Sequence, residues 1–134
     1  MARSCAMVCD RSFEQRDYYP RVSEALNALA VRHSFDGVRT VEGYGAAMNA
    51  MQVLENPPGC YFKFPKPQQG GGSLWDFAAT AAIFNACGAV ACDFYGQALE
   101  LNRADSTFMN HRGVLYASDV ALAGEVRGLL AVIE

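Results

Sequence analysis

The segment from Leu74 to Cys87 constrains the fold of this chain most strongly. Its apolar residues recur at helical spacing on two faces of a helix instead of one. One stripe is Leu74, Phe77, Ala78, Ala81 and Phe84, and the other is Trp75, Ala79, Ala82, Ile83 and Ala86. A helix that is apolar on several sides is expected to lie between two layers of structure. Gly88 is well placed to end it.

The first two-thirds of the chain alternates between strand and helix patterns. Strands are expected at Cys5–Asp10, Val38–Glu42 and Cys60–Phe64, and helices from Pro20 and over Ala46–Glu55. This alternation predicts an α/β fold, with a layered mixed sheet flanked by helices. No repeat or linker divides residues 1–134, so a single domain is expected.

The last third is predicted to contain a hairpin, a further strand and a final helix. The hairpin would join Ala89–Asp93 to Ala98–Leu101 through a turn at Tyr95-Gly96. A strand is expected at Gly113–Tyr116, and Ser118 or Asp119 would cap a helix running to Ile133. The stretch from Pro65 to Gly72 is the clearest loop, and an internal loop of this kind more often serves a site than a linker.

Composition excludes several classes of function. The formal net charge is −3 and no Lys/Arg run is present, so a nucleic-acid partner is not expected. No apolar stretch is long enough to span a membrane, and the N-terminal residues lack the pattern of a signal peptide. The five cysteines are odd in number and lie mostly in apolar runs, which predicts free thiols and a cytoplasmic location.

The stretch Gly70-Gly-Gly-Ser-Leu-Trp-Asp76 is the most informative for function. Ser73 and Asp76 have the spacing of a capping box at the start of the helix, and helix capping alone would account for both residues. A carboxylate on a first helical turn beside a glycine loop can also bind Mg²⁺. The free backbone amides there would favour an anion.

Other candidate sites are weaker. The pairs Cys5/Cys9 and Cys87/Cys92 lack the tight spacing of a zinc knuckle. His33 and His111 have no local signature of a Cys–His nucleophile, and structural roles are expected for both. The three glycines 70–72 are not followed by the Lys-Ser/Thr of a P-loop. Lys63 and Lys66 flank the loop and could face a phosphate, although solvated lysines are the commoner outcome.

Several segments together resemble the C-terminal half of the inositol monophosphatase superfamily. The segment Trp75-Asp-Phe-Ala-Ala79 resembles its WDxAA signature, and Asp93-Phe-Tyr-Gly96 its next turn. The run from Asn110 to Ser118 resembles its last strand. Upstream, Asp10-Arg-Ser-Phe13 and Gly43-Tyr-Gly-Ala-Ala-Met48 fall where the family has two substrate segments.

The resemblance implies the C-terminal domain of the sugar-phosphatase fold and hydrolysis of a small phosphate monoester with Mg²⁺. It implies that Asp76 binds the metal. Substrate-binding positions implied by it are Arg11, Ser12, Gly45, Ala46, Gly72 and Ser73.

The family's Asp-Pro-x-Asp-Gly metal motif is absent from these residues, and one carboxylate cannot hold the metal cluster. The chain is therefore expected to be incomplete as a catalyst alone, corresponding to the family without its N-terminal catalytic half. It would act on a small phosphorylated metabolite with a companion N-terminal half or as a homo-oligomer. The alternative is a non-catalytic fragment that oligomerises or binds a partner through exposed aromatic residues such as Phe62, Phe64 and Trp75.

Overall fold

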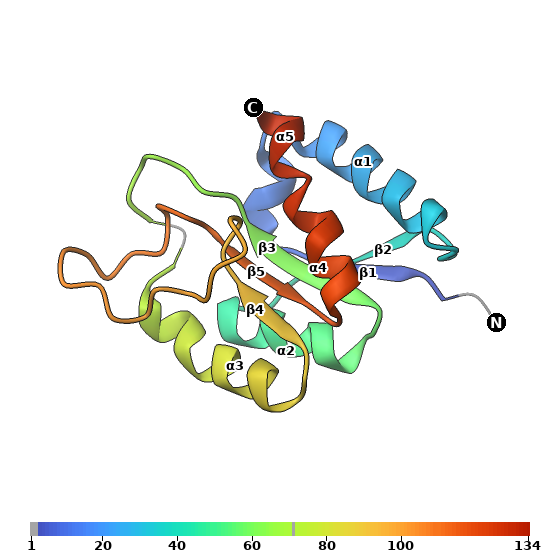
Figure 1. Ribbon diagram of the computed structural model, residues 1–134. Helices are drawn as coiled ribbons and strands as arrows, with labels where there is room; N and C mark the ends of the chain where they lie inside the picture. Colours follow the sequence, from blue (N-terminus) through green and yellow to red (C-terminus); the bar gives the residue numbers. More distant parts are fainter. Residues whose placement is uncertain (1–2, 71) are drawn as a thin grey trace.

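The computed structural model describes residues 3–70 and 72–134 and has a three-layer α/β architecture (Figure 1). Five strands form one open sheet in the order β2-β1-β3-β5-β4. The strands are β1 (Cys5–Val8), β2 (Val38–Val41), β3 (Gly59–Lys63), β4 (Val90–Cys92) and β5 (Val114–Ala117). β1 is parallel to β2 and β3, whereas β5 is antiparallel to β3 and β4. The α/β class and the mixed sheet expected from the sequence are confirmed.

The helices cover both faces of the sheet. They are the 3-10 helix η1 (Arg11–Gln15), α1 (Tyr19–Arg32), α2 (Ala46–Glu55), α3 (Leu74–Ala86), α4 (Val120–Arg127) and α5 (Leu130–Ile133). α1, α4 and α5 lie over one face, and α2 and α3 lie side by side over the other (Figure 1). Within the described residues, no helix combines the length and apolarity needed to cross a bilayer.

Two apolar cores form because β1, β3 and β5 are buried on both faces. On β1, the side chains of Cys5 and Met7 pack into the core beneath α1 and α4, while Val8 packs beneath α2 and α3. β3 divides in the same way, with Phe62 on the first face and Tyr61 on the second. Successive side chains of a strand point to opposite faces, so a run of apolar residues fills both cores at once.

α3 has the expected start and end, but the prediction that it lies between two layers is wrong. Its first stripe supplies Phe77 and Phe84 to the core beneath α2 and α3, and Ala81 is buried on the same side. The second stripe is exposed, and Trp75 retains 66% of its accessible surface. The reason is that α2 already lies beside α3 on this face, and within the described residues nothing forms a further layer outside them.

The expected hairpin at residues 89–101 is also wrong. The turn at Tyr95-Gly96 forms, but residues 98–101 are not a strand, and β4 pairs with β5 instead. The buried Asp93 carboxylate accepts hydrogen bonds from the backbone N–H groups of Tyr95 (2.8 Å) and Gln97 (3.0 Å). These bonds turn the chain away from β4 directly after the strand, so residues 98–101 do not pair with β4. The strand that pairs with β4 is β5.

Two smaller expectations also need correction. The final helix is capped by Asp119, whose carboxylate accepts from the Leu122 N–H, but it divides at Gly128 into α4 and α5. Phe62 and Phe64 are 4% and 7% exposed, so they are core residues and not a docking surface. They pack with Phe13 and Phe94 in an aromatic cluster.

All five cysteines are free, as expected.

Candidate functional site

The carboxyl ends of β1 and β3 form the point where the strand connections diverge. β1 leads through α1 to β2 on one side of it, and β3 leads through α3 to β4 on the other. In open α/β sheets, ligands bind in the crevice outside such a switch point. Because β5 is antiparallel, its first residues reach the same edge, and the loop 64–73 begins there as well.

A cavity of about 230 Å³ opens at this edge, which we call the crevice. Its polar lining includes one carboxylate, three cationic side chains and three neutral polar side chains. These residues are Asp10, Arg16, Lys63, Lys66, Ser12, Gln68 and Asn110. Its apolar lining includes Phe13, Tyr18, Phe62, Phe64, Pro65, Met109 and Ile133. Cations outnumber carboxylates here although the whole chain is negatively charged, so the crevice favours an anionic ligand.

Asp10 organises the centre of the crevice. Its carboxylate forms an ion pair with Lys63 (2.7 Å) and accepts hydrogen bonds from the Tyr61 hydroxyl (3.1 Å) and the Asn49 side-chain amide (3.0 Å). Tyr61 and Asn49 are fully buried. Burial, followed by the nearby charge of Asp10, raises the pKa of Tyr61 well above its usual value, so its hydroxyl remains a donor.

The loop preceding α3 is fixed by backbone contacts to the segment 107–110. The Leu74 N–H donates to the Thr107 carbonyl, and the Lys66 N–H donates to the Asn110 carbonyl. The Asn110 side-chain amide in turn donates a hydrogen bond to the Lys66 carbonyl (3.0 Å). These bonds hold Lys66 at the rim of the crevice, where an anion could reach its ammonium group.

Asp76 has the capping role that its spacing allows. Its Oδ2 accepts a hydrogen bond from the Ser73 N–H (2.8 Å), which satisfies a free donor at the helix start. Ser73 is buried, and its backbone forms an isolated antiparallel β-bridge with that of Phe108. Gly72 has a φ of +91°, and a Cβ there would lie 2.7 Å from the Phe77 ring. Gly72 is therefore required by the local backbone, whether or not it touches a substrate.

The other expected substrate residues lie at the same edge but do not form one site. Ser12 lines the crevice. Arg11 is exposed on η1, with its guanidinium beside Gly43. Gly45 and Ala46 begin α2 beyond the end of β2 and do not line the crevice. Of the six substrate-binding residues expected from the sequence, only Ser12 lines the crevice.

Asp10, Arg16 and Tyr61 were not singled out by sequence reasoning as site residues. Asp10 and Lys63 are 53 positions apart, and no local motif links them. The available signal was topological, since both lie at the carboxyl ends of strands that the alternation pattern had identified. Pairing the carboxyl ends of neighbouring parallel strands would have brought them together.

His111 has a structural position, as expected. Its Nδ1 lies 2.6 Å from an Arg103 guanidinium nitrogen and its Nε2 lies 2.8 Å from a Glu100 carboxylate oxygen. An arginine can only donate, so Nδ1 is the acceptor and Nε2 carries the proton. The ring thereby ties together two parts of the loop between β4 and β5.

No protein-family model matches the chain, and no curated protein matches it either.

Proposed function

We propose that this chain binds a small phosphate monoester in the crevice, as a substrate-binding domain of the inositol monophosphatase type. The observation that supports this proposal most directly is the cluster of Arg16, Lys63 and Lys66 around a cavity at the topological switch point. The sequence resemblance centred on Trp75-Asp76 supports the same class of ligand. The ancestral reaction would be hydrolysis of that monoester.

The cations differ in their availability for a ligand. Lys63 is already paired with Asp10. Within the described residues, neither Arg16 nor Lys66 has an ion-pair partner, so both can offer their full charge to a phosphate. Arginine binds phosphate through two parallel N–H donors, and lysine acts as a point charge. The aromatic side of the crevice would contact the remainder of the ligand.

The chain alone does not fit a resident Mg²⁺ at Asp76. One oxygen of this carboxylate already accepts a hydrogen bond from the Ser73 N–H. Within residues 3–70 and 72–134, the one group of three or more potential ligand side chains does not include Asp76. Asp76 would thus contribute one ligand, with the others supplied by residues outside this sequence. Catalysis would require that companion.

Ligand binding tests the proposal directly. Inositol-1-phosphate, fructose-1,6-bisphosphate and 3′-phosphoadenosine-5′-phosphate would be titrated calorimetrically into the wild-type chain and two variants. Arg16→Gln and Lys66→Gln should each weaken binding about tenfold or more, because each removes a charge-assisted hydrogen bond worth about 1.5–3 kcal/mol. Arg21→Gln is the matched control, since Arg21 is exposed on α1 and outside the crevice.

Equal affinity of all variants for the phosphorylated compounds, or no binding by any, would reject the proposal. Phosphate release would be measured in parallel, with and without Mg²⁺, for the wild type and Asp76→Asn. The expected result is no release by the chain alone. Mg²⁺-dependent release that Asp76→Asn abolishes would show that the chain completes its own metal site.

A second function is favoured by the exposed stripe of α3. Trp75, Ala79, Ala82, Ile83 and Ala86 are all exposed along one side of the helix. Met48 on the neighbouring α2 is 52% exposed. An apolar surface of this kind is typical of association sites, which corresponds to a non-catalytic domain that self-associates or binds a partner. Light scattering that finds a dimer in the wild type and a monomer in Trp75→Ser would favour this function.

A further inference from the structure

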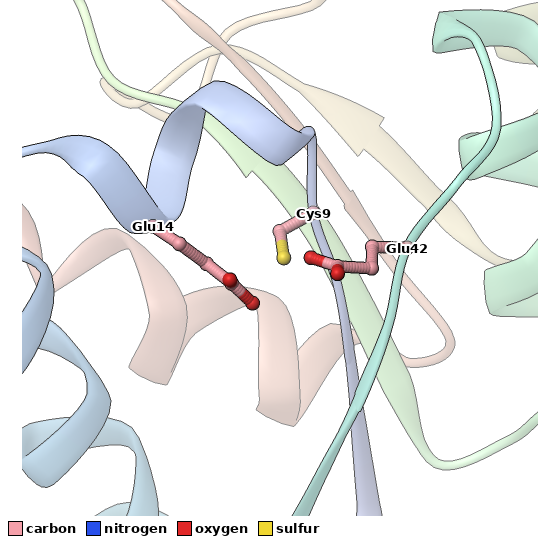
Figure 2. A group of neighbouring side chains, drawn as sticks. All are labelled: Cys9, Glu14 and Glu42. Carbon is pink, nitrogen blue, oxygen red and sulfur yellow. The ribbon is translucent and has the colours of Figure 1, made fainter.

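Three potential metal ligands meet at the carboxyl ends of β1 and β2, next to the crevice. They are the Cys9 thiol just after β1, the Glu14 carboxylate on η1 and the Glu42 carboxylate just after β2. One ligand atom from each lies within 4.8 Å of the others. Figure 2 shows the three side chains extending toward one another from these separate segments. Among the described residues, this is the one cluster with such geometry.

The Cys9 thiol distinguishes this cluster from an ordinary pair of surface acids. Cys9 is 3% exposed and its thiol is free. Its sulfur is nevertheless directed at the two glutamates, which are exposed at the rim (Figure 2). A thiol that only filled the core would gain nothing from facing carboxylates, because buried sulfur prefers apolar neighbours. A Cys thiolate and Glu carboxylates are each ligands that Zn²⁺ accepts in proteins.

The electrostatics of the cluster favour a cation. Within the described residues, neither Glu14 nor Glu42 takes part in an ion pair. Glu14 and Glu42 are both acidic and their carboxylates lie close together, so their like charges repel each other. A divalent cation bound among the three ligand atoms would replace this repulsion with attraction.

We propose that Cys9, Glu14 and Glu42 bind one zinc-class divalent cation. Zinc–sulfur bonds of ~2.3 Å and zinc–oxygen bonds of ~2.1 Å place tetrahedral ligand atoms roughly 3.5 Å apart. The exposed glutamates need to close by at most about 1.3 Å to reach that spacing. Mg²⁺ prefers oxygen ligands, so the thiolate selects against it. The cation would link η1 to the end of β2 beside Asp10 and Ser12, and its binding is independent of the phosphate proposal.

Titration of the full chain with Co²⁺ tests this site, because a cobalt–thiolate bond gives a near-ultraviolet charge-transfer absorption. The wild type should bind one equivalent and show that absorption, and Zn²⁺ but not Mg²⁺ should displace the cobalt. Cys9→Ser should abolish the absorption. Glu14→Gln and Glu42→Gln should each weaken Zn²⁺ binding at least ~10-fold. Cys87→Ser is the control, since Cys87 is an exposed free thiol elsewhere on the fold.

Three results would overturn the proposal. They are an unchanged absorption in Cys9→Ser, its loss in Cys87→Ser, and a stoichiometry of half an equivalent, which would mean a site between two copies. Far-ultraviolet circular dichroism would check that each variant is folded. If Cys9→Ser does not fold, the two exposed glutamate variants decide the question, because unchanged Zn²⁺ affinity in both also overturns it.

Discussion

Removal of the Asp10 carboxylate should destabilise the fold mainly through the donors that it leaves behind. Asp10→Ala deletes the acceptor for the Tyr61 hydroxyl and the Asn49 amide, together with the partner of Lys63. Tyr61 and Asn49 are both 0% exposed, so neither can turn to water. Lys63 retains 24% side-chain exposure and can be solvated. The two buried donors therefore dominate the cost.

The magnitude follows from counting those donors. A buried polar group left without a partner costs about 1–3 kcal/mol, so two such groups predict a loss of about 2–6 kcal/mol. In a Tyr61→Phe background, Asp10→Ala leaves only one buried donor unpaired. Its cost should fall by about 1–3 kcal/mol, which is the coupling energy that a double-mutant cycle measures. Asp10→Asn keeps an acceptor and should cost about 1 kcal/mol or less, mainly through the lost ion pair.

Urea unfolding followed by far-ultraviolet circular dichroism would measure these free energies. Tryptophan fluorescence is a poor probe here, because the single tryptophan, Trp75, is 66% exposed in the folded state. Equal costs of Asp10→Ala in the wild-type and Tyr61→Phe backgrounds would refute the reasoning. So would an Asp10→Asn variant as unstable as Asp10→Ala, since it would mean that charge and not hydrogen bonding controls this site.

Two further substitutions test local features of the fold. Gly72→Ala should cost at least about 1–3 kcal/mol in urea unfolding, because its φ is +91° and a Cβ would collide with Phe77, whereas Gly124→Ala should be neutral or slightly stabilising. The Glu125 carboxylate accepts from His33, which lowers its pKa below the ordinary 4.5. A lowered folded pKa contributes stability above that value that is lost as pH falls, so Glu125→Gln should flatten the acid side of the stability profile. Parallel wild-type and variant profiles below pH 4.5 would contradict this.

Local patterns in the sequence were sufficient to predict most of the elements. α2 begins and ends where its composition indicated, and Gly88, with a φ of +74°, follows the end of α3 as expected for a helix terminator. The buried strands were recognisable because apolar runs on both faces can only be satisfied between layers. These features depend on backbone preferences and on burial of each segment by itself, which a single sequence records.

The tertiary structure decided which segments meet. β4 pairs with β5 and not with residues 98–101, and only one of the two apolar stripes of α3 is covered. The residues of the crevice and of the Cys9 cluster come from separate segments, and Asp10 and Lys63 are 53 positions apart. Local sequence patterns cannot specify which segments come into contact, because these contacts depend on competition among all segments for the same strand edges and sheet faces. That competition placed Asp10 beside Lys63 and left Trp75 in solvent.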